Sequence, residues 1–211
     1  MLIKSRELIR GDTIIEVLFA ITVFSLLAVG AITVMNQGTA TAQKALEITL
    51  VRQQIDAQAE SIRYIQNTAA KQLAAGTASS KEITDWRAMT QLVSQGGKAV
   101  EPERISQFTT TNEGECGAIP DNAFITNAHT GELTTQKPSA IGADGVPYAH
   151  VLYDDENISQ FQGASGLWIE AARNGVGADS VDFHIRACWH APGSGPATTL
   201  GTIVRLYAPS N

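Results

Sequence analysis

The fold of this chain is decided by residues 11–35, which read GDTIIEVLFAITVFSLLAVGAITVM. Between residues 17 and 35 no residue is charged and none is proline. At a rise of 1.5 Å per residue, such a segment forms a helix of roughly 28 Å, close to the hydrocarbon thickness of a bilayer. A helix satisfies its own backbone polar groups, which lipid requires. We therefore predict one membrane-spanning helix near the N-terminus.

A single carboxylate, that of Glu16, stands at the entrance to the apolar run. An ionisable group at that depth is costly, so it is treated as functional and needs a partner. Cleavage after Gly11 would create an α-ammonium group at Asp12, one helical turn from Glu16. The ammonium of a neighbouring chain would then pair with this carboxylate and set the register between subunits. The alternative is a polar residue at the headgroup level of an ordinary signal anchor.

These residues resemble the processing site and N-terminal helix of type IV pilins and pseudopilins. The resemblance rests on Gly11, the Thr-Ile-Ile run over 13–15, Glu16 and the apolar tail, and residues 16–25 are most similar to minor pilins. It implies that a prepilin peptidase cuts after Gly11 and that Glu16 becomes the fifth residue of the mature chain. Asp12 departs from the usual phenylalanine or methionine, which leaves N-methylation open. The proline common near the middle of the helix is also absent.

The helix is expected to continue beyond the membrane segment. Residues 37–73 contain no proline, and an apolar stripe with steps of three or four residues indicates one buried helix face. The stripe consists of Ile48, Val51, Ile55, Ala59, Ile62 and Ile65. Gly30 and Gly38 are the expected weak points of the helix. We predict a leader over 1–11, a transmembrane or filament-core helix over 12–36, an amphipathic half over 37–75 and a globular head over 76–211.

The head is predicted to be α+β. A short helix is expected over 84–95, ended by the glycines at 96 and 97, and an extended piece over 123–126 precedes a turn at Thr130 and Gly131. Strands are expected over 148–153, 167–171, 181–187 and 198–207, the last two as a hairpin. Packing this antiparallel sheet on the helix stripe gives the pilin-like lollipop that the resemblance implies.

Charge bears on topology and partners. The chain carries −6, and removing a leader of +2 leaves −8, which argues against a general nucleic-acid-binding surface. The basic leader favours a cytoplasmic N-terminus and an exported head. A cleaved secretory signal is the alternative, but the apolar run is too long for one. The expected partners are membrane lipid along residues 13–35 and, from the resemblance, the prepilin peptidase, an inner-membrane assembly platform and other pilin subunits.

The two cysteines, Cys116 and Cys188, are expected to form a disulfide in an oxidising compartment. A weaker alternative is a zinc site, because His184, Cys188 and His190 share one face of a predicted strand. The residues Asp154, Asp155 and Glu156 are weak calcium candidates, since they lack the glycine and spacing of a twelve-residue calcium loop and read better as a solvated turn. No cofactor is predicted.

No catalytic constellation stands out. Ser194 lies between glycines but lacks the strand–turn–helix context of a nucleophile elbow. The histidines at 129, 150, 184 and 190 have no nucleophile at a recognisable spacing. We expect a structural subunit, not an enzyme, located in the membrane and, after assembly, in a pilus at the cell surface. The alternatives are a pseudopilin of a type II secretion or DNA-uptake system and, from another class, a signal-anchored exported enzyme or binding domain.

Overall fold

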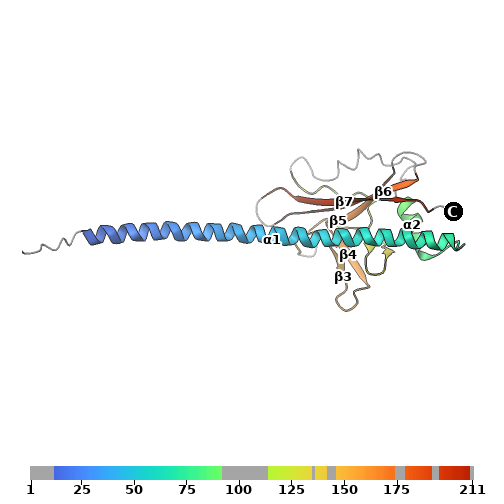
Figure 1. Cartoon of the computed structure of the whole chain (residues 1–211), viewed down its shortest axis with the longest axis horizontal. Helices are drawn as coiled ribbons and strands as arrows, with labels where there is room; N and C mark the ends of the chain where they lie inside the picture. Colours follow the sequence, from blue (N-terminus) through green and yellow to red (C-terminus); the bar gives the residue numbers. More distant parts are fainter. Residues whose placement is uncertain are drawn as a thin grey trace, which may run out of the picture. The chain divides into compact units, whose positions relative to one another are not determined.

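A computed structural model of the chain describes residues 12–91, 114–134, 136–141, 146–173, 179–191 and 195–209. Its first element is the helix α1, Asp12–Ala74, which runs for 63 residues without interruption through Gly30 and Gly38 (Figure 1). The predicted long helix is therefore confirmed, and its end at Ala74 falls one residue before the predicted end of its amphipathic half at 75. The chain forms two compact units that divide within α1, between Gln43 and Lys44.

In the second unit, α1 buries the predicted apolar stripe. Five of its six members are 4 % exposed or less, namely Val51, Ile55, Ala59, Ile62 and Ile65. Ile48 is partly buried against the same core, and Ala69 and Leu73 extend the stripe. Polar residues enter the buried surface of the helix as well, since Glu47, Gln58 and Ser61 are buried. The spacing rule predicted the apolar face but not these polar insertions.

An antiparallel sheet packs on this helix face. Its order is β5 (Leu167–Arg173), β6 (Ser180–Trp189) and β7 (Thr198–Tyr207). In register, Phe183 of β6 pairs with Ala171 of β5 and with Val204 of β7. Along β6 the predicted alternation is confirmed: Val181, Phe183, Ile185 and Ala187 are buried in the core that includes the α1 stripe. In Figure 1 the strands lie along the C-terminal half of α1.

The helix α2 spans Lys81–Gln91 and begins three residues before its predicted start at 84. The reason is Ser80, which caps it: the Ile83 amide donates to Ser80 Oγ at 3.2 Å, and the Thr84 amide donates to the Ser80 carbonyl at 3.0 Å. Trp86 and Met89 of this helix are buried. The predicted end of the helix at residues 95–97 lies outside the described residues.

Two short hairpins complete the second unit. β1 (Thr126–Asn127) and β2 (Glu132–Leu133) flank the predicted turn, in which Gly131 has a φ of 69°. β3 (His150–Tyr153) pairs with β4 (Phe161–Ser165) in a separate sheet. The strand predicted over 148–153 therefore starts at His150. β4 was not predicted because Gln162 and Gly163 interrupt its apolar pattern.

The turn between β4 and β5 requires a glycine. Gly166 has a φ of 64°, in the left-handed region that other residues rarely adopt. A Cβ atom at this position would also lie 2.4 Å from a side-chain carbon of Ile141 and 2.7 Å from the Cys188 carbonyl oxygen. Both the conformation and the space therefore select glycine where the chain passes from one sheet to the other.

Candidate functional site

Within the first unit, residues 14–35 form an exposed apolar helix. Every large hydrophobic side chain from Ile14 to Met35 is 39 % to 74 % exposed, and these side chains surround the helix on all sides. The most apolar 18-residue window has a mean hydropathy of 2.5 and none of it is buried. A helix that is apolar on all sides needs lipid or other apolar helices around it. By length and composition, this segment is able to cross a membrane.

The hydroxyl groups within the apolar segment are bonded to their own helix. Thr22 Oγ1 donates to the Phe19 carbonyl at 2.8 Å, Ser25 Oγ to the Ile21 carbonyl at 2.8 Å and Thr33 Oγ1 to the Val29 carbonyl at 2.9 Å. These bonds satisfy the hydroxyl donors without water. From residue 14 to 35, Glu16 is the one polar side chain that does not have such a bond. The segment is thus suited to a dry environment everywhere except at its first turn.

Glu16 is exposed, and no other described residue bonds or pairs with its carboxylate. Asp12 is the first residue of α1, and Gly11 lies outside the described residues. Glu16 lies four residues after Asp12, about one turn further along the helix.

Three polar contacts attach the C-terminal half of α1 to the strands of the second unit. The Trp189 indole Nε1 donates to buried Glu47 at 3.0 Å. Gln58 bonds with both the backbone and the hydroxyl of Thr126, and Gln66 Nε2 donates to the Tyr207 carbonyl at 3.2 Å. Because β6 ends near Glu47 and β7 ends near Gln66, β6 runs antiparallel to the helix and β7 runs parallel to it.

The expected disulfide is present in the structure. Cys116 and Cys188 are joined, with their Cα atoms 5.7 Å apart. The alternative zinc site is not formed: Cys188 is used by the disulfide, and His190 Nε2 lies 3.0 Å from the Glu115 carboxylate. Among the described residues, no three histidine, cysteine or acidic side chains gather in a way that would hold a metal ion.

The weak calcium candidates form a local turn. Asp154 Oδ1 accepts the backbone amides of Glu156 and Asn157, both at 2.9 Å, and its Oδ2 accepts Gln162 Nε2 at 2.9 Å. These bonds commit the Asp154 carboxylate to closing the turn between β3 and β4. Asp155 and Glu156 are exposed. The arrangement matches the solvated-turn reading of these residues.

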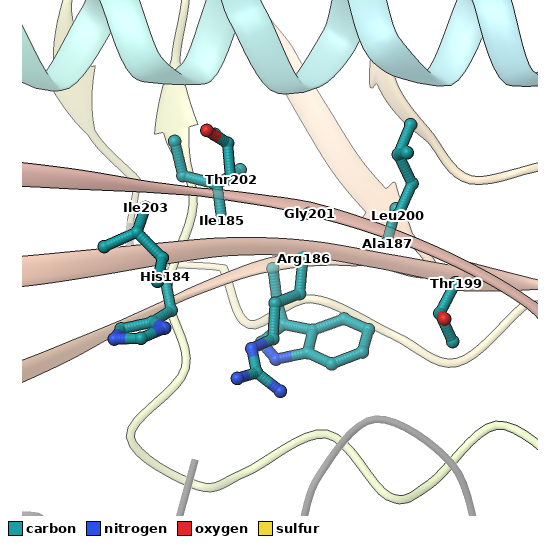
Figure 2. Close-up of a pocket in the computed structure, with 10 residues that line it drawn as sticks. His184, Ile185, Arg186, Ala187, Thr199, Leu200, Gly201, Thr202 and Ile203 are labelled. Atoms are coloured by element: carbon teal, nitrogen blue, oxygen red, sulfur yellow. The ribbon is translucent and has the colours of Figure 1, made fainter. Parts of the chain in front are cut away.

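The outer face of the sheet, which faces away from α1, carries a polar cluster that the sequence did not single out. It consists of Trp168 and Glu170 on β5 and His184 and Arg186 on β6. The indole Nε1 of Trp168 donates to Glu170 Oε1 at 2.6 Å. In Figure 2, His184, Arg186 and Thr199 project to the side of the strands opposite α1. Beside them lies a shallow pocket of about 260 Å³ that extends across Gly201 to Ile203.

Burial sets the ionisation of this cluster. It raises the pKa of the Glu170 carboxyl, against the bond from Trp168 and the charge of Arg186. Burial also lowers the pKa of His184, aided by the Arg186 charge and opposed by Asp182. His184 is therefore neutral near pH 7, while Arg186 keeps its charge although burial lowers its pKa too. Near pH 7 the positive charge of the pocket is therefore that of the Arg186 guanidinium group.

His129 and His150 have aromatic and backbone neighbours within the second unit. The His129 ring meets the Tyr153 ring edge-on, with centroids 4.5 Å apart, and His150 Nδ1 lies 2.8 Å from the Tyr148 carbonyl. Ser194 lies outside the described residues. Trp168 and Trp189 are 2 % and 0 % exposed, so both indoles are packed inside the second unit.

Comparisons with known proteins leave the family open. No family model matches the chain, and no match was found among curated proteins or among solved structures. The functional argument therefore depends on the residues themselves.

Proposed function

We propose that this protein is a structural subunit, of the low-copy or minor kind, of a type IV pilus or a related filament. The observation that supports it most is the apolar helix over residues 14–35 of the first unit, which is exposed on every side, whose hydroxyls are bonded internally and whose one charged residue over that range is Glu16. The same helix continues into the core of a disulfide-bonded α+β unit. An anchor and an assembly surface are thereby combined in one element.

In this proposal, a prepilin peptidase cuts after Gly11 while the leader lies in the cytoplasm. The new α-ammonium group at Asp12 would then stand at the N-terminal end of α1, where the helix dipole is already positive. Such a terminus needs a carboxylate nearby, and Glu16 needs a cation. A neighbouring subunit satisfies both needs when its ammonium pairs with Glu16 in the apolar filament core.

Two alternatives remain distinct in their consequences. A pseudopilin of a type II secretion or DNA-uptake system would use the same processing and the same helix, in a different machine. A signal-anchored binding domain, from another class, is favoured by the pocket on the outer face of the sheet. It would keep residues 1–11 and have no use for Glu16.

The test is the mass of the N-terminal peptide in membrane and sheared-surface fractions of the native host. We expect a peptide that begins at Asp12, methylated or not, in both fractions. Glu16→Ala should prevent recovery in the sheared fraction, whereas Glu60→Ala, an exposed glutamate on the same helix, should not. A peptide that still begins at Met1 in both fractions would reject the filament proposal in favour of an anchored domain.

A further inference from the structure

The guanidinium group of Arg186 has no hydrogen-bond or ion-pair partner among the described residues. Within that part of the chain, its Nη1 atom is buried without an acceptor. Arginine stays protonated at any physiological pH, so the group is a charge and not merely a dipole. Buried donors without acceptors are rare in folded proteins, and each calls for an explanation by a water, an ion or a ligand.

The acidic groups on the same face do not supply that acceptor. Asp182 is held by Arg205, through bonds of 2.6 Å and 2.7 Å to its two oxygens. Glu170 accepts the Trp168 indole at 2.6 Å and acts on Arg186 only through space. The direct cross-strand neighbours of Arg186 are Trp168 on β5 and Gly201 on β7. Neither neighbour has a side-chain oxygen.

The pocket lies directly beside this unpaired charge (Figure 2). Gly201 has no side chain opposite Arg186, which leaves the space over β7 open, and a Cβ there would lie 2.9 Å from the Ile185 carbonyl oxygen, closer than real Cβ atoms come. Ile203, which is 61 % exposed, and the indole of Trp168 contribute apolar walls. None of the residues that line the pocket is acidic. The site therefore combines the positively charged guanidinium group of Arg186 with an apolar surface about as large as one side chain.

We propose that this pocket binds a carboxylate carried on a short apolar stem. The planar fork of Arg186 fits a carboxylate through two parallel bonds, and the stem packs against the exposed side chain of Ile203. A phosphate group fits less well, because a dianion would demand more donors than one arginine and a neutral histidine supply. The proposal stands independently of the filament proposal.

Two sources supply this chemistry: a free organic acid, or an acidic side chain of another protein. β7 is the last strand in the order of its sheet, and an extended segment pairing with its outer edge would place alternate side chains beside Gly201. If one of these alternate side chains is acidic, no side chain of β7 lies between it and Arg186, because the intervening residue is Gly201.

The experiment uses the full-length chain in detergent micelles, with 3-phenylpropanoate as the probe and 3-phenylpropanamide as its uncharged counterpart. Calorimetric or saturation-transfer titration should show saturable binding of the acid and at least about tenfold weaker binding of the amide. Arg186→Gln should weaken acid binding about tenfold, and Arg186→Lys should fall between, because it keeps the charge but loses the fork. Arg52→Gln, the same change at an exposed position on α1, should have no effect.

Equal binding of acid and amide, or unchanged binding by a folded Arg186→Gln, would overturn the proposal. If Arg186→Gln does not fold, Thr199→Trp takes its place, because it fills the pocket from an exposed position and should abolish binding. Unchanged binding by that variant would also overturn the proposal. The peptide Val-Thr-Glu-Thr-Val and its glutamine counterpart identify the source. A glutamate peptide that binds about tenfold more tightly than the free acid indicates a protein partner, and one that binds no better indicates a small acid.

Discussion

The clearest test of how α1 holds the second unit together is the contact between Gln58 and Thr126. The two residues are 68 positions apart, and both are fully buried. Gln58 Nε2 donates to the Thr126 carbonyl at 2.8 Å, and Gln58 Oε1 accepts the Thr126 amide at 3.0 Å and its hydroxyl at 2.6 Å. One side chain thus satisfies all the polar groups of a residue in β1.

Gln58→Ala would leave the amide and the carbonyl of Thr126 buried without partners. At about 1–3 kcal/mol for each of these two orphaned groups, the free energy of unfolding should fall by about 2–6 kcal/mol, a large share of the total for a typical domain. Urea unfolding of the full-length chain in micelles, followed by tryptophan fluorescence, measures this loss. All three tryptophans lie in the second unit and report on it.

Gln53→Ala is the matched control, since Gln53 is exposed on the same helix. It should change the free energy of unfolding by less than about 0.5 kcal/mol. Gln58→Glu should also destabilise the protein, because it keeps the acceptor, loses the donor and buries a charge. The reasoning would be refuted if Gln58→Ala and Gln53→Ala unfolded at the same urea concentration, with equal exchange of the Thr126 amide.

Three further predictions concern other buried groups. Glu47→Ala leaves the Trp189 indole without an acceptor and should cost about 1–3 kcal/mol in urea unfolding, whereas Glu47→Gln keeps an acceptor and should cost less than half of that; equal losses would contradict this account. Replacing both cysteines by serine opens a bridge between residues 72 positions apart and should lower the free energy of unfolding by about 4 kcal/mol, and a loss below about 1 kcal/mol would count against the chain-entropy origin. Because burial raises the pKa of Glu170 above its ordinary value of 4.5, the folded state binds the extra proton, so stability should fall as the pH rises from 4.5 to the raised pKa. Glu170→Gln should remove this fall, which thermal unfolding between pH 4 and pH 7 would detect, and an unchanged pH profile would argue against it.

Several elements were predictable because their signals are local. The α1 stripe and the alternation along β6 follow from the periods of a helix and a strand, and the boundaries of β7 agree with the predicted range of 198–207. The start of α2 was wrong by three residues because the cap at Ser80 was not taken into account. β4 was missed because Gln162 and Gly163 interrupt its apolar pattern, so only its pairing with β3 identifies it as a strand.

The candidate sites also divide into one that is visible in the local sequence and one that depends on strand pairing. The apolar run and Glu16 are visible in any window of the first 35 residues, and their interpretation rests on the resemblance to pilins. The pocket beside Arg186 could not be predicted, since Trp168, Arg186 and Gly201 meet only through the register of three strands. A polar residue on an alternating strand reads as solvent-facing until the structure shows that its Nη1 atom is buried.

By itself, the sequence determined where the chain is apolar and with what period, and hence the long helix, its buried face and the main strands. Those features depend on residues within a few positions of one another, where backbone geometry alone sets the contacts. Only the tertiary structure decided which buried polar groups are satisfied: Glu47 by Trp189, Gln58 by Thr126, and Arg186 by no described residue. Hydrogen bonding is directional and short-ranged, so partners separated by 68 or 142 residues are set by how the elements pack and not by any pattern along the chain.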